Sequence, residues 1–173
     1  MTDNRNIVDI YKYWTEEAIK ADLRTKHHNF SALVVNQIND FNLGSVIRNS
    51  NAVCAKEVIV YGKKSFDRRS TVGTHLYMDM KHVKFVEELD LTNKVVVGID
   101  NIEGAVPMET FEWPKEHVVM AFGQETTGLC EEVLKLCKHV VYIQQYGSVR
   151  SLNVGCASAI AMFSYCLQNN KTR

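Results

Sequence analysis

The sequence predicts an α/β fold, a mainly parallel sheet with helices on both faces. Two observations lead to this prediction. Short apolar runs alternate with segments of helical periodicity along the 173 residues. The runs are also continuously apolar and lack the apolar–polar alternation of a strand with one solvated face, as expected of parallel strands that are covered on both sides. Ligands bind to such folds at the carboxyl ends of the strands, so functional residues are expected just after the apolar runs.

The first element expected is an amphipathic helix over residues 6–25. Its apolar residues are spaced as on one face of a helix, at Ile7, Ile10, Tyr11, Trp14 and Ala18. Further helices are predicted over residues 42–55, 129–137 and 152–167. Apolar runs predict strands over residues 32–35, 58–61, 83–86, 95–99, 117–122 and 140–143. Residues 63–80 are expected to form a basic loop with a short helix, and residues 100–116, which include both prolines, an irregular connection.

The last predicted helix is apolar on two sides. One stripe consists of Leu152, Cys156, Ala159, Ile160, Phe163 and Leu167. A second stripe consists of Val154, Ala157, Ala161 and Tyr165. A helix with two apolar stripes needs two partners. We expect the sheet to cover one stripe and a second subunit to cover the other.

Length and composition are those of one soluble globular domain. The chain is long enough to bury one sizeable core, and we expect a single domain over residues 1–173 with a short N-terminal helical extension at about residues 1–28. No apolar run is long enough to span a membrane, and the N-terminus lacks the pattern of a secretion signal. The five cysteines are odd in number and form no CxxC pair. We therefore expect a cytoplasmic protein with reduced thiols in its core.

The formal net charge of the chain is zero, which argues against a surface coated in positive charge for nucleic acid. Local basic clusters are nevertheless present at Lys63–Lys64, at Arg68–Arg69 and over residues 24–28. A solvated surface is the commoner role of such clusters, and a phosphate-binding patch is the alternative.

Polar segments follow three of the predicted strands, at residues 36–42, 123–128 and 144–153. If these strand ends lie at one edge of the sheet, the segments form one site. In the second segment Gly123 and Gly128 bracket a polar loop, and glycines there permit a positive φ and close approach of a ligand to the backbone. The loop lacks the Lys-Ser/Thr of a P-loop and the GxGxxG of a dinucleotide fold.

Each segment also has a plain structural interpretation. Asn42 suits a helix N-cap, and Arg48 is either a surface side chain or a guanidinium aimed at a phosphate. Glu125 would complement a helix dipole, and Ser151 would cap the last helix with Asn153 solvated in its first turn. The scattered histidines support no Ser–His–Asp or Cys–His arrangement, and no His or Cys spacing suggests a metal site.

Taken together and in this order, the three segments resemble the motifs of the SpoU/TrmH family of RNA 2′-O-ribose methyltransferases. They read NLGSVIR from Asn42 to Arg48, then VVMAFGQETTGL, then YIQQYGSVRSLNVGCASAIAMF. Each motif alone is weak, but three in order over residues 32–167 are specific. The chain departs from many members at Gln144, where they have a proline, and so loses a rigid φ but no functional group.

The resemblance implies a catalytic group of five residues. Arg48 corresponds to the family's central catalytic residue, and Asn42, Glu125, Ser151 and Asn153 would orient it, the target ribose and the loops. An arginine stays protonated and is a poor general base. We expect Arg48 to grip a phosphate near the target ribose, so that this phosphate or a nearby group accepts the hydroxyl proton.

The resemblance also implies S-adenosylmethionine as the cofactor, held against the backbone at Gly123, Ile143 and Leu152 and near Ile99. It implies a deep trefoil knot at the C-terminal end and a homodimer with the last helix in its interface. In that dimer Arg48 would serve a cofactor pocket made partly by the other chain.

The expected partner is RNA, with tRNA favoured over rRNA and a D-loop guanosine as one target. Candidate RNA contacts are the N-terminal helix, the loop from Lys63 to Arg69 and the C-terminal residues Lys171 to Arg173. Two other functions remain open from the residues alone. One is an RNA-binding module of the same fold without significant catalysis, and the other is a small α/β enzyme that acts on a free nucleotide.

Overall fold

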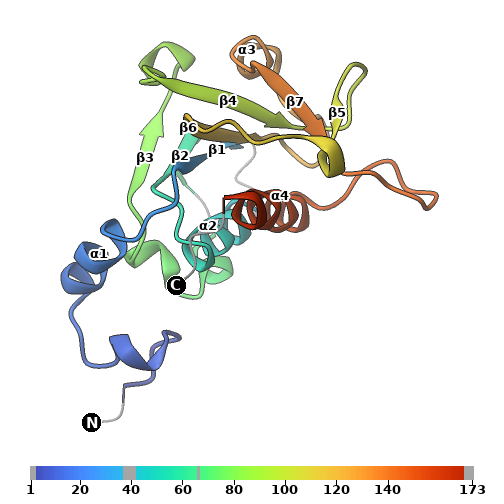
Figure 1. Ribbon diagram of the computed structural model, residues 1–173. Coiled ribbons are helices and arrows are strands. Elements are labelled where there is room, and N and C mark those ends of the chain that lie inside the picture. Colours follow the sequence, from blue (N-terminus) through green and yellow to red (C-terminus); the bar gives the residue numbers. More distant parts are fainter. Residues whose placement is uncertain (1–2, 37–41, 66, 170–173) are drawn as a thin grey trace.

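Seven strands form one sheet in which every pair of neighbours is parallel, in the order β3-β2-β1-β6-β4-β7-β5 (Figure 1). This computed structural model describes residues 3–36, 42–65 and 67–169. The strands are β1 (Phe30–Asn36), β2 (Val58–Gly62), β3 (Met80–Val83), β4 (Lys94–Ile99), β5 (Val106–Pro107), β6 (His117–Phe122) and β7 (His139–Tyr142). The parallel sheet predicted from the sequence is confirmed.

Helices cover both faces of the sheet, as the sequence predicts. The helices are α1 (Glu16–Arg24), α2 (Asn42–Ala52), α3 (Glu131–Leu134) and α4 (Val154–Gln168). In Figure 1, α2 and α4 lie on one face of the sheet and α3 on the other. Ala32 and Val34 of β1 belong to the core beneath α2 and α4, while Leu33 and Val35 belong to the core beneath α3. Because alternate side chains point to opposite faces and both faces are buried, the strand is continuously apolar over residues 32–35.

Strand β7 lies between β4 and β5, although β5 follows β4 directly in the sequence. Ile99 of β4 and Val106 of β5 are both level with Val141 of β7. Parallel strands normally need a crossover of about a dozen residues or more, whereas residues 100–105 are all that joins these two. This short connection therefore passes over the carboxyl end of β7.

The N-terminal helix is shorter than the sequence predicts. Instead of one helix over residues 6–25, a 3-10 turn at Asp9–Tyr11 is followed by an irregular stretch in which Tyr13 has a φ of 68°. Helix α1 then begins after Thr15, whose Oγ1 accepts a hydrogen bond from the Ala18 N–H at 3.2 Å. This N-cap fixes the helix start, and the apolar residue Ile10 is left 66% exposed.

Three further segments differ clearly from the predictions. Strand β3 begins at Met80 rather than at residue 83, and residues 86–88 form a 3-10 turn. Helix α3 covers four residues rather than nine, because the chain must turn from it into β7 at His139. The connection predicted over residues 100–116 contains the edge strand β5 and a 3-10 turn at Met108–Thr110.

The cysteines are free thiols, and their predicted place in the core is confirmed only in part. Cys130, Cys137 and Cys166 are partly buried and pack against the two apolar cores, Cys54 is partly buried, and Cys156 is exposed. Cys156 is exposed because it lies on the side of α4 that faces away from the sheet. Among the described residues, no helix is both long and apolar enough to cross a membrane.

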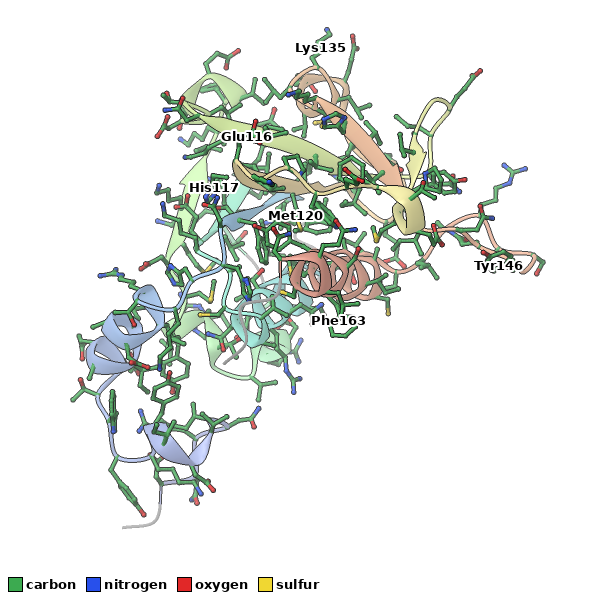
Figure 2. The ribbon with its side chains drawn as sticks, viewed as in Figure 1. Glu116, His117, Met120, Lys135, Tyr146 and Phe163 are labelled. Atoms are coloured by element: carbon green, nitrogen blue, oxygen red, sulfur yellow. The ribbon has the colours of Figure 1, made fainter. Side chains whose placement is uncertain are left out.

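The amino edge of the sheet carries a half-buried histidine, His117, at the start of β6 (Figure 2). Its Nε2 lies 2.9 Å from Ser31 Oγ and its Nδ1 lies 3.1 Å from Asn29 Oδ1. Burial, together with the nearby Lys56 and Lys94, lowers the pKa of His117 from the usual 6.5 to about 4, against an opposing effect of Glu57. The folded state therefore keeps this imidazole neutral at a pH where the unfolded chain binds a proton.

We expect the free energy of unfolding to fall as the pH is lowered from about 6.5 to about 4, and part of this loss to come from His117. The change His117→Gln retains a polar side chain but removes the titrating group. Urea unfolding at pH 7 and pH 5 should therefore show a smaller loss of stability in the variant than in the wild type. An equal loss in both proteins would mean that other groups carry the acid sensitivity.

Candidate active site

A cavity of about 330 Å³ opens at the carboxyl edge of the sheet, where the chain leaves β4, β6 and β7. Its walls are residues 99–102, 122–129, 142, 143, 145, 150–152, 154 and 157. The volume is at the lower end of the range of about 300–1,000 Å³ that is usual for small-molecule sites. The four residues predicted to contact a cofactor, Gly123, Ile143, Leu152 and Ile99, all lie in these walls.

Two glycines give the loop between β6 and α3 its shape. The N–H of Gln124 donates to the Gly128 carbonyl at 2.9 Å, and the N–H of Gly128 donates to the Gln124 carbonyl at 2.9 Å. Gly128 has a φ of 67°, and a Cβ on Gly123 would come within 2.1 Å of the Gly128 carbonyl carbon. Only glycines allow this close approach of backbone to backbone, so the loop is a tight hairpin that holds Glu125 at the cavity rim.

Asp100 ties the end of β4 to that hairpin. Its Oδ2 accepts from the Leu129 N–H at 2.8 Å, and its Oδ1 accepts from the Asn101 N–H at 2.8 Å. Sequence reasoning missed Asp100 and Asn101 because the whole stretch after β4 resembled an irregular connection. The available signal was an acidic side chain directly after a buried apolar run, at the edge where ligands bind.

The loop between β7 and α4 forms the third wall. Asn101 Nδ2 donates to the Arg150 carbonyl at 3.1 Å, which ties this loop to the connection after β4. Gln144, which stands where many family members have proline, accepts from the Tyr142 hydroxyl at 3.1 Å and donates to the Gln145 carbonyl at 3.0 Å. These side-chain bonds restrain the loop where the rigid φ of proline is missing.

A hydrogen-bonded group, which we call the Asn–Glu–Asn network, joins the three sequence motifs. Asn42 Nδ2 donates to Glu125 Oε2 at 2.8 Å, and Asn153 Nδ2 donates to Asn42 Oδ1 at 2.8 Å. The Asn153 Nδ2 also lies 3.5 Å from Glu125 Oε1. The side chains come from the start of α2, the loop after β6 and the start of α4. The network therefore holds three distant segments in one arrangement, with a charge-assisted bond at Glu125.

Asn153 is the N-cap of α4, whereas the sequence suggested Ser151 for this role. The Asn153 Oδ1 accepts from the N–H groups of Gly155 at 2.9 Å and Cys156 at 3.4 Å. Because that oxygen faces backbone donors, the amide nitrogen of the same side chain must face Asn42. Helix α4 begins at Val154, so Ser151 lies in the preceding loop, where it lines the cavity.

Arg48 stands apart from the cavity within one chain. Its side chain is exposed on α2, it is absent from the cavity walls, and no described residue forms a hydrogen bond or ion pair with its guanidinium. The neighbouring Asn49 binds α4, since its Nδ2 donates to the Gly155 carbonyl at 2.8 Å and lies 2.9 Å from Ser158 Oγ. Among the described residues no cluster of three or more His, Cys, Asp or Glu could hold a metal ion.

Comparison with known proteins gives this geometry a context. The sequence pattern of the SpoU rRNA Methylase family matches residues 29–163. A 23S rRNA (guanosine-2′-O-)-methyltransferase, RlmB, of Acinetobacter baylyi is 29% identical over 147 residues, which are 79% of this chain and 59% of that protein. The tRNA (guanosine(18)-2′-O)-methyltransferase of Thermus thermophilus is 26% identical over 155 residues, which are 84% of this chain and 78% of that protein. The chain thus spans about three fifths of the length of RlmB.

Solved structures share the fold. The A. aeolicus TrmH/SpoU tRNA modifying enzyme superposes with a TM-score of 0.78 at 21% identity, over 90% of this chain and 83% of that one. AviRb of Streptomyces viridochromogenes, solved in complex with the cofactor AdoMet, superposes with a TM-score of 0.74 at 25% identity, over 88% of this chain and 62% of that one. The family match runs from just before β1 into α4 and includes all three motifs. The chain therefore belongs to the SpoU methylase family.

Proposed function

We propose that this protein is an S-adenosylmethionine-dependent RNA methyltransferase that methylates the ribose 2′-hydroxyl of a guanosine in tRNA or rRNA. The observation that carries the proposal is the cavity at the carboxyl edge, built from the motif segments that the Asn–Glu–Asn network joins. The names of two relatives support the choice of nucleotide, because both describe guanosine 2′-O-methyltransferases, one of 23S rRNA and one of tRNA.

The residues of the cavity suit S-adenosylmethionine. Gly123 lines the cavity without a side chain, and Ile99, Leu129 and Ala157 provide apolar surface for an adenine ring. The polar side chains at the rim suit the amino-acid end of the cofactor. AviRb, which has the same fold, was solved with this cofactor. When bound, the cofactor supplies an electrophilic methyl group on a positively charged sulfur.

The protein's contribution to such a reaction is positioning. A protonated guanidinium at Arg48 would bind a phosphate next to the target ribose through two parallel hydrogen bonds and so fix the 2′-hydroxyl. The hydroxyl proton would pass to that phosphate or to a nearby acceptor, since Arg48 cannot accept it. Glu125 and the two asparagines of the network would keep the three loops in place, and Ser151 would contribute its hydroxyl at the cavity wall.

The proposal includes a homodimer through α4. Its outward stripe is exposed in the single chain, with Ile160 at 42%, Phe163 at 60% and Leu167 at 59%. Figure 2 shows Phe163 pointing away from the sheet. An apolar groove of about 370 Å³ continues this surface onto α2, with walls from Asn49, Ala52, Val53, Ala159, Ile160, Met162 and Phe163. A second copy docked here would lie beside Arg48, so that Arg48 serves the partner's cavity.

We expect the wild type to sediment as a dimer at micromolar concentration and the variant Phe163→Glu to sediment as a monomer, because a carboxylate would have to be desolvated in the apolar interface. The matched control is Phe85→Glu, since Phe85 is 64% exposed at a site remote in sequence from α2 and α4. This control should remain dimeric. A monomeric wild type, or a dimeric Phe163→Glu variant, would remove support for an interface on α4.

The proposal also includes the trefoil knot that the family resemblance implies. Support comes from β7, because the chain that leaves it must pass the short connection of residues 100–105. The Asn101–Arg150 hydrogen bond joins these two segments. We further propose that the residues before 29, where the family match begins, are a helical extension of a single methyltransferase domain.

The proposed function is tested by mapping ribose methylation in RNA from cells with and without the protein, and by methyl transfer to tRNA and rRNA transcripts in vitro. We expect loss of one 2′-O-methylguanosine in the absence of the protein. RNA binding without any transfer would favour a non-catalytic RNA-binding module. Transfer to free nucleotides but not to RNA would favour a small-molecule enzyme.

A further inference from the structure

We propose that the loop between β2 and β3 binds the phosphate backbone of the RNA substrate through Lys63, Lys64 and Arg68, which we call the cationic track. The inference rests on the proposed function, because it assigns the surface that holds the RNA beside the cavity. Three independent features of the loop support it, namely its anchoring, its position against α2 and its uncompensated charge.

The beginning of the loop is anchored at the carboxyl edge of the sheet. Asn36, the buried last residue of β1, donates from Nδ2 to the Lys63 carbonyl at 2.6 Å and to the Ser65 carbonyl at 2.9 Å. The Lys63 N–H in turn donates to the Asn36 carbonyl at 2.6 Å. The backbone that bears the two lysines is therefore fixed at the edge where the cavity opens, while their side chains are exposed.

The later part of the loop packs on α2. The 3-10 turn Arg68–Thr71 contacts this helix, and a Cβ on Gly44 would lie 1.6 Å from Ser70 Oγ. Glycine at position 44 thus allows the turn to touch the helix backbone. Arg48 follows Gly44 by one helical turn and so lies on the same face of α2. In Figure 1 the green segment between β2 and β3 lies against α2. The loop therefore brings its cations to the side of α2 that carries Arg48.

The charge of the track is uncompensated. Within the described residues, Lys63, Lys64 and Arg68 form no ion pair with a carboxylate, whereas Arg69 pairs with Asp67 at 2.5 Å. Arg48 is likewise without a carboxylate partner in this part of the chain. A cation without a partner can bind a phosphate with no ion pair to break, so these four side chains are available to phosphate groups of an RNA.

The other RNA-contact candidates from the sequence are less suitable. Arg24 pairs with Asp79 at 2.7 Å and Lys26 pairs with Asp22, so the cluster over residues 24–28 has much of its charge balanced. In the N-terminal segment, Arg5 forms an ion pair with Asp3 at 2.7 Å. Lys12 forms one with Asp9 at 2.7 Å. Lys171 to Arg173 lie outside the described residues.

The shape of the track favours a polyanion over a free nucleotide. Its cations are exposed and spread over a loop, and none of them lines either of the two cavities. A free nucleotide would need a concave site, whereas a chain of phosphates gains affinity by releasing counterions at each contact. Since the chain has no net charge, a local cluster has to provide this attraction.

The test compares two triple variants that remove the same charge. The first changes the track by Lys63→Gln, Lys64→Gln and Arg68→Gln. The control changes Lys56→Gln, Lys115→Gln and Lys138→Gln, which are exposed, form no ion pair among the described residues and precede β2, β6 and β7 at the opposite edge of the sheet. Binding of bulk tRNA is measured by fluorescence anisotropy at several salt concentrations, together with the KM for RNA and the Kd for S-adenosylmethionine.

A plot of log K for tRNA binding against log salt concentration has a negative slope. We expect this slope to become less steep by about 0.7 to 0.9 for each phosphate contact removed, and so by roughly two to three in the track variant. At about 0.1 M salt its tRNA affinity should fall roughly tenfold to a few hundredfold, and its KM for RNA should rise. The Kd for S-adenosylmethionine should stay the same in both triple variants, and the control should keep the wild-type slope.

A track variant with the wild-type slope, or an equal loss in both triple variants, would overturn the cationic track. If the wild-type protein nevertheless transfers methyl groups to RNA, the proposed function would be kept and only the cationic track rejected. Conversely, a slope difference in a protein without any methyl transfer would keep the track as an RNA-binding surface while the proposed function fails.

Discussion

The variant Arg48→Ala is expected to transfer methyl groups at least about a hundredfold more slowly than the wild type, with an unchanged affinity for S-adenosylmethionine. The large effect follows from the loss of the group that would fix the phosphate next to the reacting hydroxyl. Cofactor affinity should be retained because Arg48 would contact a phosphate of the RNA rather than the cofactor. Stability should also be retained, since the side chain is exposed and has no described partner to lose. Single-turnover methyl transfer and calorimetric titration of the cofactor measure the two quantities.

The matched variant for this position is Arg48→Lys, which keeps the charge but not the planar fork that binds a phosphate through two bonds. It should be intermediate in rate. Co-expression of Arg48→Ala chains with Gly123→Val chains tests the proposed action across the dimer, because a mixed dimer then contains one complete site only if Arg48 serves its partner's cavity. Normal turnover in Arg48→Ala would disprove the catalytic assignment, and inactive mixed dimers would place Arg48 at the cavity of its own chain.

The second large effect is expected at Asn153, which both caps α4 and belongs to the Asn–Glu–Asn network. Asn153→Ala removes both functions and should cost about 1 kcal/mol in the free energy of unfolding. Asn153→Ser keeps a capping oxygen but cannot reach Asn42, so its stability should stay within about 0.5 kcal/mol of the wild type. Both variants should transfer methyl groups roughly tenfold to a hundredfold more slowly than the wild type, because they lose the hydrogen bond to Asn42 that joins the loops around the cavity.

Chemical denaturation and methyl-transfer rates on the same samples separate the two roles. The informative protein is Asn153→Ser, in which the cap is preserved. If this variant is as active as the wild type while Asn153→Ala is slow and unstable, Asn153 acts as a cap alone and the network has no part in the reaction.

The strand ends that line the cavity were predictable because polar residues after buried strands are a local signal. Gly123, Ile143 and Ile99 follow or end apolar runs, and a parallel sheet brings such ends to one edge. Leu152 follows a polar segment, and only the family resemblance pointed to it. The contacts between Asn42, Glu125 and Asn153 were not predictable in the same way. They join side chains 83 and 111 residues apart, so their geometry depends on the completed fold.

The residue at which a helix begins was also hard to predict from the sequence. Ser151 and Asn153 are equally good N-caps by residue type, and only the observed start of α4 decides between them. At the N-terminus the apolar spacing continues across Tyr13 although the helix does not, because Tyr13 has a φ of 68° and Thr15 caps the start of α1. Periodicity therefore predicted which segments are helical better than where each helix begins.

The strand order has a consequence for how the chain folds during synthesis. The central strand β6 lies between β1 and β4 and is made long after β1, so on the ribosome β1 keeps one edge without a partner until residues 117–122 emerge. An open edge of this kind is a template for aggregation, and pairing across such long sequence separations is slow. The nascent chain is thus open to edge-to-edge aggregation for longer than a protein built from neighbouring hairpins.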